Sequence, residues 1–164
     1  MAKVPEIAEN FKLLREQALK SNWRKLGLAP TEKNPNVWGV IMEIGYPGTV
    51  VTLVCINNGT VNIYFGNGGG ITGGGEYEAI RMKAEEFIHT AEVLFKKLNP
   101  TKKYPLPDVD RVRFYILTFK GIFTAQDNRN IAKEDHELFP LLHSGHQVIA
   151  ALRAVDHGAE SSSK

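Results

Sequence analysis

Reactive sulfur and long apolar runs are scarce in this chain of 164 residues. Its single cysteine, Cys55, cannot form a disulfide within the chain, and no run approaches the roughly 20 apolar residues that cross a bilayer. The first ten residues also lack the apolar stretch of a secretory signal. We therefore exclude a disulfide-stabilised secreted domain, and we predict a cytoplasmic protein that makes no use of a membrane.

Excess charge of one sign is also missing. The chain has 20 Lys and Arg residues against 18 Asp and Glu residues, which leaves a formal net charge of +2. The basic residues Lys12, Arg15 and Lys20 are interleaved with Glu9 and Glu16, as on a solvated helix face. Because nucleic-acid binders usually concentrate basic charge on one surface, we do not expect nucleic acid as a partner.

The sequence contains none of the compact motifs of common enzymes. There is no G-x-S-x-G, no H-E-x-x-H and no G-K-[ST] ending to a glycine-rich loop. Cys55 lies in the middle of an apolar run, away from any histidine that could activate a thiol. These absences favour a non-enzymatic protein without a cofactor.

Hydrophobic periodicity predicts an α+β fold. The apolar pattern indicates a helix, three strands in quick succession, a second helix, one or two further strands and a last helix broken at Pro140 and near Ser144 and Gly145. We expect an antiparallel sheet of four to five strands, with an N-terminal helix and two helices mainly on one face. The predicted elements span residues 6–26, 37–46, 49–56, 60–65, 77–98, 111–119 and 130–155, with a short strand after Gly121. We divide the chain into a helical arm and connector (1–35), a single α+β domain (36–157) and a disordered tail (158–164).

Asn58-Gly59 predicts a tight hairpin between the second and third strands. A two-residue type I′ loop would place Ile56 opposite Val61 and Val54 opposite Ile63. The other sheet face would then hold Leu53, Cys55 and Tyr64, which is too apolar to face water. We expect the first helix or a second chain to cover it, and we predict a homodimer or a protein partner.

The glycine-rich segment FGNGGGITGGGE, residues 65–76, runs from a strand into the second predicted helix. Two interpretations remain open. The glycines permit tight turns and close backbone approach, or their N–H groups bind a small anionic ligand at the helix N-terminus. A dinucleotide-binding unit is disfavoured because the preceding strand belongs to a hairpin series. The candidate ligand-binding residues within loop 66–75 are Asn67, Gly68, Gly69, Gly70, Thr72, Gly73, Gly74 and Gly75.

Four of the five histidines lie in the last thirty residues of the chain, close to several carboxylates such as Asp127. Imidazole and carboxylate are ligands that zinc and iron use. Pro140 interrupts the spacing between them, so we expect no bound metal. The weak candidates for a metal site are Asp135, His136, His143 and His146.

Two functional hypotheses follow. We favour a small cytoplasmic module that binds a protein partner or its own copy without chemistry. The alternative is a domain that binds a small ligand, or an enzyme, with its site where loop 66–75 meets the following helix.

Overall fold

The computed structural model describes residues 6–162. Helices and strands follow one another in the predicted order, with two short strands and two 3₁₀ turns added. In chain order they are α1 (Glu9–Leu19), β1 (Val37–Tyr46), β2 (Thr49–Ile56), β3 (Val61–Phe65), β4 (Gly70–Ile71), η1 (Gly74–Glu76), α2 (Glu78–Leu94), η2 (Phe95–Lys97), β5 (Asn99–Thr101), β6 (Arg111–Thr118), β7 (Gly121–Asn128) and α3 (Phe139–Ser162).

All strands belong to one antiparallel sheet in the order β4-β3-β2-β1-β6-β7-β5. The predicted α+β class with an antiparallel sheet is therefore confirmed. The predicted count of four to five strands is wrong, because the sheet has seven. The additional strands β4 and β5 have two and three residues, which is too short for an alternating pattern to show.

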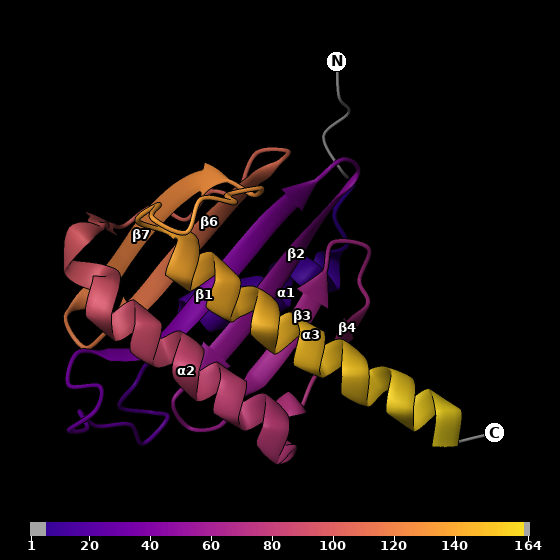
Figure 1. Cartoon of the computed structure of the whole chain (residues 1–164), viewed down its shortest axis with the longest axis horizontal. Coiled ribbons are helices and arrows are strands. Elements are labelled where there is room, and N and C mark those ends of the chain that lie inside the picture. The colour runs from indigo at the N-terminus through magenta and orange to yellow at the C-terminus, as the bar shows by residue number, and fades with distance from the viewer. Residues whose placement is uncertain (1–5, 163–164) are drawn as a thin grey trace.

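The sheet is covered by helices on both faces (Figure 1). α2 and α3 lie side by side on one face, and their apolar residues form the larger core with strand residues such as Val40 and Phe114. α1 lies on the other face, where Phe11 and Leu19 pack against Ile41 and other residues of a second core. The first helix thus covers the second apolar face of the sheet, although the residues on that face differ from those predicted.

The β2–β3 hairpin is antiparallel as predicted, but its register differs from the prediction by one residue. Cys55 pairs with Val61 and Leu53 with Ile63, so Leu53 and Cys55 join the larger core beneath α2 and α3. The physical reason is the turn. Gly59 has a φ of +91°, whereas Asn58 is not among the positive-φ residues, so a longer turn with one left-handed glycine replaces type I′.

The helix boundaries also differ from the sequence prediction. α1 ends at Leu19, earlier than predicted, and α3 is continuous from Phe139 to Ser162. Pro140 does not break α3 because it lies in the first turn, where a missing N–H costs no helical hydrogen bond. Gly145 lies inside α3 at a close contact with the sheet. A Cβ at this position would lie 2.5 Å from Met42 Sδ, which explains a glycine within the helix.

The division into arm, domain and tail stays a prediction. Its tail begins within α3, and residues 163–164 lie outside the described part of the chain. Among residues 6–162, no helix combines the length and the apolar character that crossing a membrane requires.

Both edges of the sheet are poorly suited to pairing with a further strand. β4 offers two residues at one edge, and Pro100 at the centre of β5 has no N–H to donate at the other. Short edge strands and proline are the usual protection against edge-to-edge association.

Candidate functional site

Loop 66–75 uses several of its N–H groups within the protein. The Gly68 N–H donates to the Phe65 carbonyl at 2.9 Å, and the Gly73 N–H donates to Asn62 Oδ1 at 3.1 Å. The Gly69 N–H donates to Asn67 Oδ1 at 3.0 Å. An anion bound here would have to compete with these internal acceptors, because each N–H carries one hydrogen.

Close backbone approach accounts for other glycines of the loop. A Cβ at Gly75 would lie 1.5 Å from the carbonyl oxygen of Gly59, and one at Gly70 would lie 2.6 Å from that of Ile63. A Cβ at Gly74 would lie 2.6 Å from Leu152 Cδ2 on α3. Packing of the loop against the β2–β3 turn, β3 and α3 thus accounts for Gly70, Gly74 and Gly75.

The glycine loop and the acidic and histidine-rich segment lie far apart in the fold. The loop contains β4 at one edge of the sheet, whereas Asp127 belongs to β7, next to the strand at the opposite edge. Ile71, Thr72 and Gly74 line a small hollow of about 110 Å³ with Leu152 and other residues of α3. The structure therefore does not bring Asp127, His136 or His143 to the loop.

His136 and His143 have separate partners. His136 Nε2 lies 3.1 Å from Asp127 Oδ2, while His136 Nδ1 accepts a hydrogen bond from the Leu138 N–H at 3.1 Å. The ring of His143 stacks on Phe139 with centroids 5.6 Å apart. Desolvation, Arg153 and His143 together lower the pKa of His146. Among the side chains described, those of residues 6–156, no three His, Cys, Asp or Glu residues are grouped to hold a metal ion.

Cys55 is enclosed in the larger core. Its side chain is 0% exposed, and desolvation raises the pKa of its thiol well above the ordinary value. A raised pKa suppresses the thiolate, which is the nucleophilic form. In the folded protein Cys55 therefore acts as a small apolar side chain.

This burial leads to a prediction for thiol chemistry. At neutral pH, Ellman's reagent is expected to modify the native protein at least about 100-fold more slowly than the protein in denaturant, because modification requires opening of the core. The measurement is the rate of absorbance increase in each condition. Rapid stoichiometric modification of the native protein would contradict the burial of Cys55.

The second core contains a buried ion pair that sequence reasoning missed. The Glu43 carboxylate, 0% exposed, accepts hydrogen bonds from Arg15 Nε at 2.7 Å and from Arg15 Nη2 at 2.8 Å. Thr52 Oγ1 donates to the same carboxylate at 2.6 Å, and Arg15 Nη2 also donates to the Tyr104 carbonyl at 2.7 Å. The available signal was a carboxylate inside the apolar strand VIMEIGY, because a charge in such a position requires a partner.

The electrostatics of this cluster follow from its burial. Desolvation alone would lower the pKa of Arg15, but the hydrogen bonds and charge of Glu43 outweigh it and raise that pKa. Desolvation and the charge of Glu43 raise the pKa of nearby Tyr115 to about 12. The Tyr115 hydroxyl donates to the Pro105 carbonyl at 2.5 Å. With these partners the cluster joins α1 and the loop before β6 to the sheet.

The outward side of α2 carries the two most exposed large apolar side chains of the layer that α2 and α3 form. Val93 is 67% exposed and Met82 is 55% exposed. They are eleven residues apart, which places them on the same side of an α-helix. We name this surface the α2 stripe; it consists of Met82, Glu85, Glu86, His89 and Val93 on α2, and of Lys96 and Lys97 on η2.

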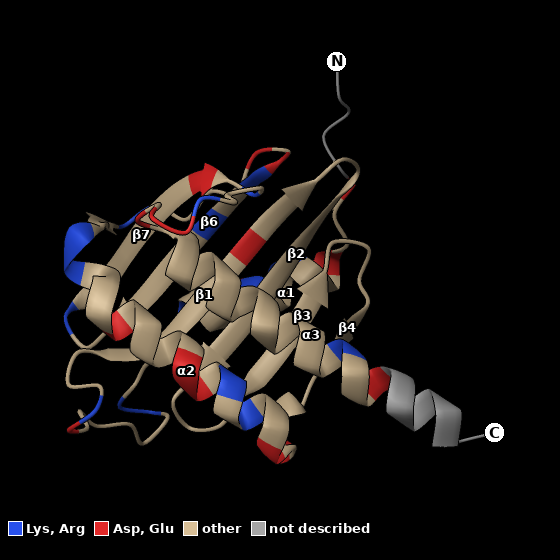
Figure 2. Cartoon of the chain, in the orientation of Figure 1, with Lys and Arg blue, Asp and Glu red and all other residues tan. Residues whose placement is uncertain are grey.

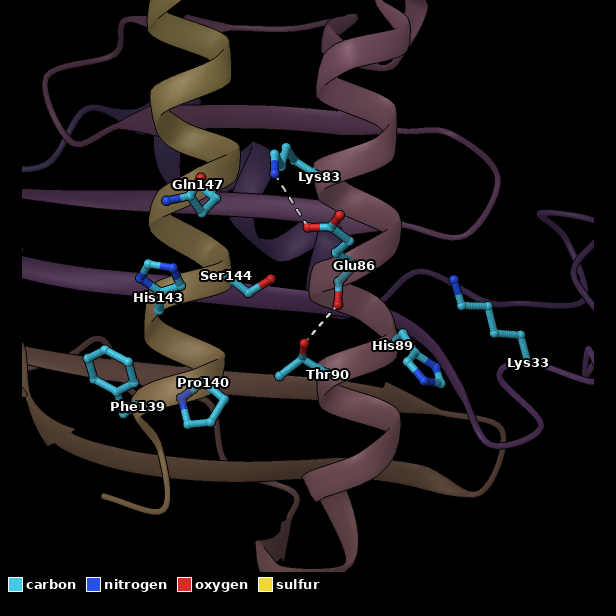
Figure 3. A pocket seen from close by; sticks show the side chains of 10 residues that line it. All are labelled: Lys33, Lys83, Glu86, His89, Thr90, Phe139, Pro140, His143, Ser144 and Gln147. Carbon is cyan, nitrogen blue, oxygen red and sulfur yellow. Dashed lines mark hydrogen bonds and ion pairs between the residues drawn. The ribbon is translucent and has the colours of Figure 1, made fainter. Parts of the chain in front are cut away.

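A shallow groove of about 610 Å³ adjoins the α2 stripe. Glu86 and Thr90 of α2 and Ser144 of α3 lie along the space between the two helices, whereas His89 points away from α3, and its Nδ1 lies 3.0 Å from Asn34 Oδ1 (Figure 3). His143 lies on the side of α3 that faces away from α2. Ser144 and His143 are therefore not arranged as a nucleophile and its base.

Comparison of the chain with protein-family models, curated proteins and solved structures finds no match.

Proposed function

We propose that this chain is a non-enzymatic protein-interaction module that binds its partner through the α2 stripe and the adjoining groove. The observation that supports this most strongly is the pair of exposed apolar side chains, Val93 at 67% and Met82 at 55%, on one side of α2. Apolar side chains left exposed on one side of a helix beside a groove favour an interaction site there.

The rest of the fold favours the same surface. The sheet edges are short or contain proline, and both sheet faces are covered by helices. The outer surface of α2 and α3 is the broad helical surface left to a partner. The buried thiol of Cys55 is compatible with a reducing compartment, and the proposal places the module in the cytoplasm.

Site-specific photo-crosslinking tests the proposal. A photoreactive amino acid replaces Val93 in the full chain, expressed in the cells from which the chain comes. We expect one adduct of defined mass, because the 67% exposed side chain would face the partner. The matched control replaces Leu13, which is 56% exposed on α1 across the sheet, and is expected to give no such adduct.

A second variant checks that the adduct reports docking. With the photoreactive group at position 82, the additional change Val93→Asp is expected to abolish the adduct, because it places a charge at the centre of the interface. Equal crosslinking from positions 93 and 13, or an adduct unaffected by Val93→Asp, would refute the proposed surface.

A further inference from the structure

We infer that the partner bound by the α2 stripe is a second copy of this chain, with the two α2 helices packed antiparallel. This inference rests on the proposed function and identifies its partner. The order of charges along the α2 stripe suggests this antiparallel pairing. Glu85 and Glu86 lie at the middle of α2, and Lys96 and Lys97 lie just after its end, all four exposed. Figure 2 shows basic residues toward the start of α2, acidic residues along its middle and basic residues again at its end near β7.

An antiparallel pair matches these charges in a single register. If Glu86 of one copy lies opposite Lys96 of the second copy, then Glu85 lies opposite Lys97 and His89 opposite Val93. A twofold axis requires each contact to occur twice, so both acidic pairs are matched by both basic pairs. Val93, the most exposed of the large apolar residues described, then lies next to the axis, where burial is greatest.

Other arrangements of two copies lose this complementarity. A parallel pair in register places Glu85 and Glu86 against the same two residues of the second copy, and like charges in contact are repulsive. The ion pair of Lys83 with Glu86 does not occupy this acidic pair firmly. The Nζ of Lys83 lies 3.6 Å from Glu86 Oε2, but the two side chains are 40% and 60% exposed, and a pair of this kind contributes little.

The groove next to the stripe adds contact area to the helix pair. A stable dimer needs roughly 1,200–2,000 Å² of buried surface, which a single helix pair does not easily supply. The groove, with a volume of about 610 Å³, has room for side chains from the second copy. The second copy can therefore contact α3 as well as α2.

Charge exchange between two variants tests this inference directly. The first variant carries Glu85→Lys and Glu86→Lys, and the second carries Lys96→Glu and Lys97→Glu. All four side chains are exposed, so both variants are expected to fold, which circular dichroism checks. By sedimentation velocity the wild-type chain is expected to be a dimer, and each variant alone is expected to dissociate with a Kd raised by about tenfold or more.

Mixing the two variants gives the decisive result. The first variant is basic at both charge positions and the second is acidic at both, so the equimolar mixture is expected to form a heterodimer. A chain with all four changes restores the antiparallel match and is expected to form a homodimer again. Wild-type Kd is expected to rise with added NaCl, since the pairs are at the surface.

Three results would overturn the inference: a wild-type chain that is monomeric at about 100 µM, variants that dimerise as the wild type does, or a mixture of the two variants that stays monomeric. Its failure is distinguishable from failure of the proposed function. If position 93 crosslinks to a protein of another mass while the chain itself is monomeric, the module interpretation stands and the self-association is wrong. An adduct with twice the mass of the chain supports both.

Discussion

Replacing Arg15 with alanine is expected to lower the free energy of unfolding by about 3–5 kcal/mol. The change removes the guanidinium that donates two hydrogen bonds to Glu43 and leaves a carboxylate that is 0% exposed with Thr52 as its remaining side-chain donor. An unpaired buried charge cannot recover its lost hydration. Urea denaturation followed by circular dichroism measures the effect.

The matched control is Lys12→Ala on the same helix. Lys12 pairs with Glu9 at 3.2 Å, but the two side chains are 57% and 90% exposed, so the expected loss is below about 0.5 kcal/mol. The double variant Arg15→Met with Glu43→Leu is expected to recover most of the stability lost in Arg15→Ala, because it removes both charges. Equal effects of Arg15→Ala and Lys12→Ala would show that the ion pair does not stabilise the fold.

Replacing Gly75 with alanine is expected to cost more than about 3 kcal/mol, because the new methyl group overlaps backbone. The added Cβ would lie 1.5 Å from the Gly59 carbonyl oxygen and 2.7 Å from its carbon, and no side-chain rotation can relieve that contact. The β2–β3 turn and η1 would have to separate. Thermal and urea denaturation of the variant measure the cost.

Gly69→Ala is the matched control in the same loop. A Cβ at Gly69 would meet Asn67 Oδ1 at 3.3 Å, a side-chain atom that can move, so the expected change is below about 1 kcal/mol in either direction. The comparison separates the two interpretations of the glycine segment. If Gly75→Ala were as mild as Gly69→Ala, close packing would not explain the glycines.

Hydrophobic patterns that extend over more than about two helical turns, or over a whole strand, were enough to predict most of the architecture. The buried residues of α2, including Ile80, Ala84, Phe87, Ile88 and Ala91, belong to the predicted apolar stripe of 77–98. The same periodicity places Met82 and Val93 on the outward side. The α2 stripe could therefore have been identified from sequence as two apolar residues on the polar face.

The features that sequence reasoning missed depend on contacts between distant residues. The observed β2–β3 register differs from the predicted one because the turn uses a single left-handed residue, Gly59. Gly145 is tolerated inside α3 because of Met42 on β1, about a hundred positions earlier. The pairing of Glu43 with Arg15 likewise joins a strand to a helix, and no local pattern encodes it.

The central position of β1 has a consequence for synthesis on the ribosome. β1 is buried along nearly its whole length and is hydrogen-bonded on one side to β2 and on the other to β6, which begins at Arg111. The nascent chain therefore completes β1, β2 and β3 long before β6 has been translated. During that interval an apolar strand has an open hydrogen-bonding edge, the kind of surface that molecular chaperones shield.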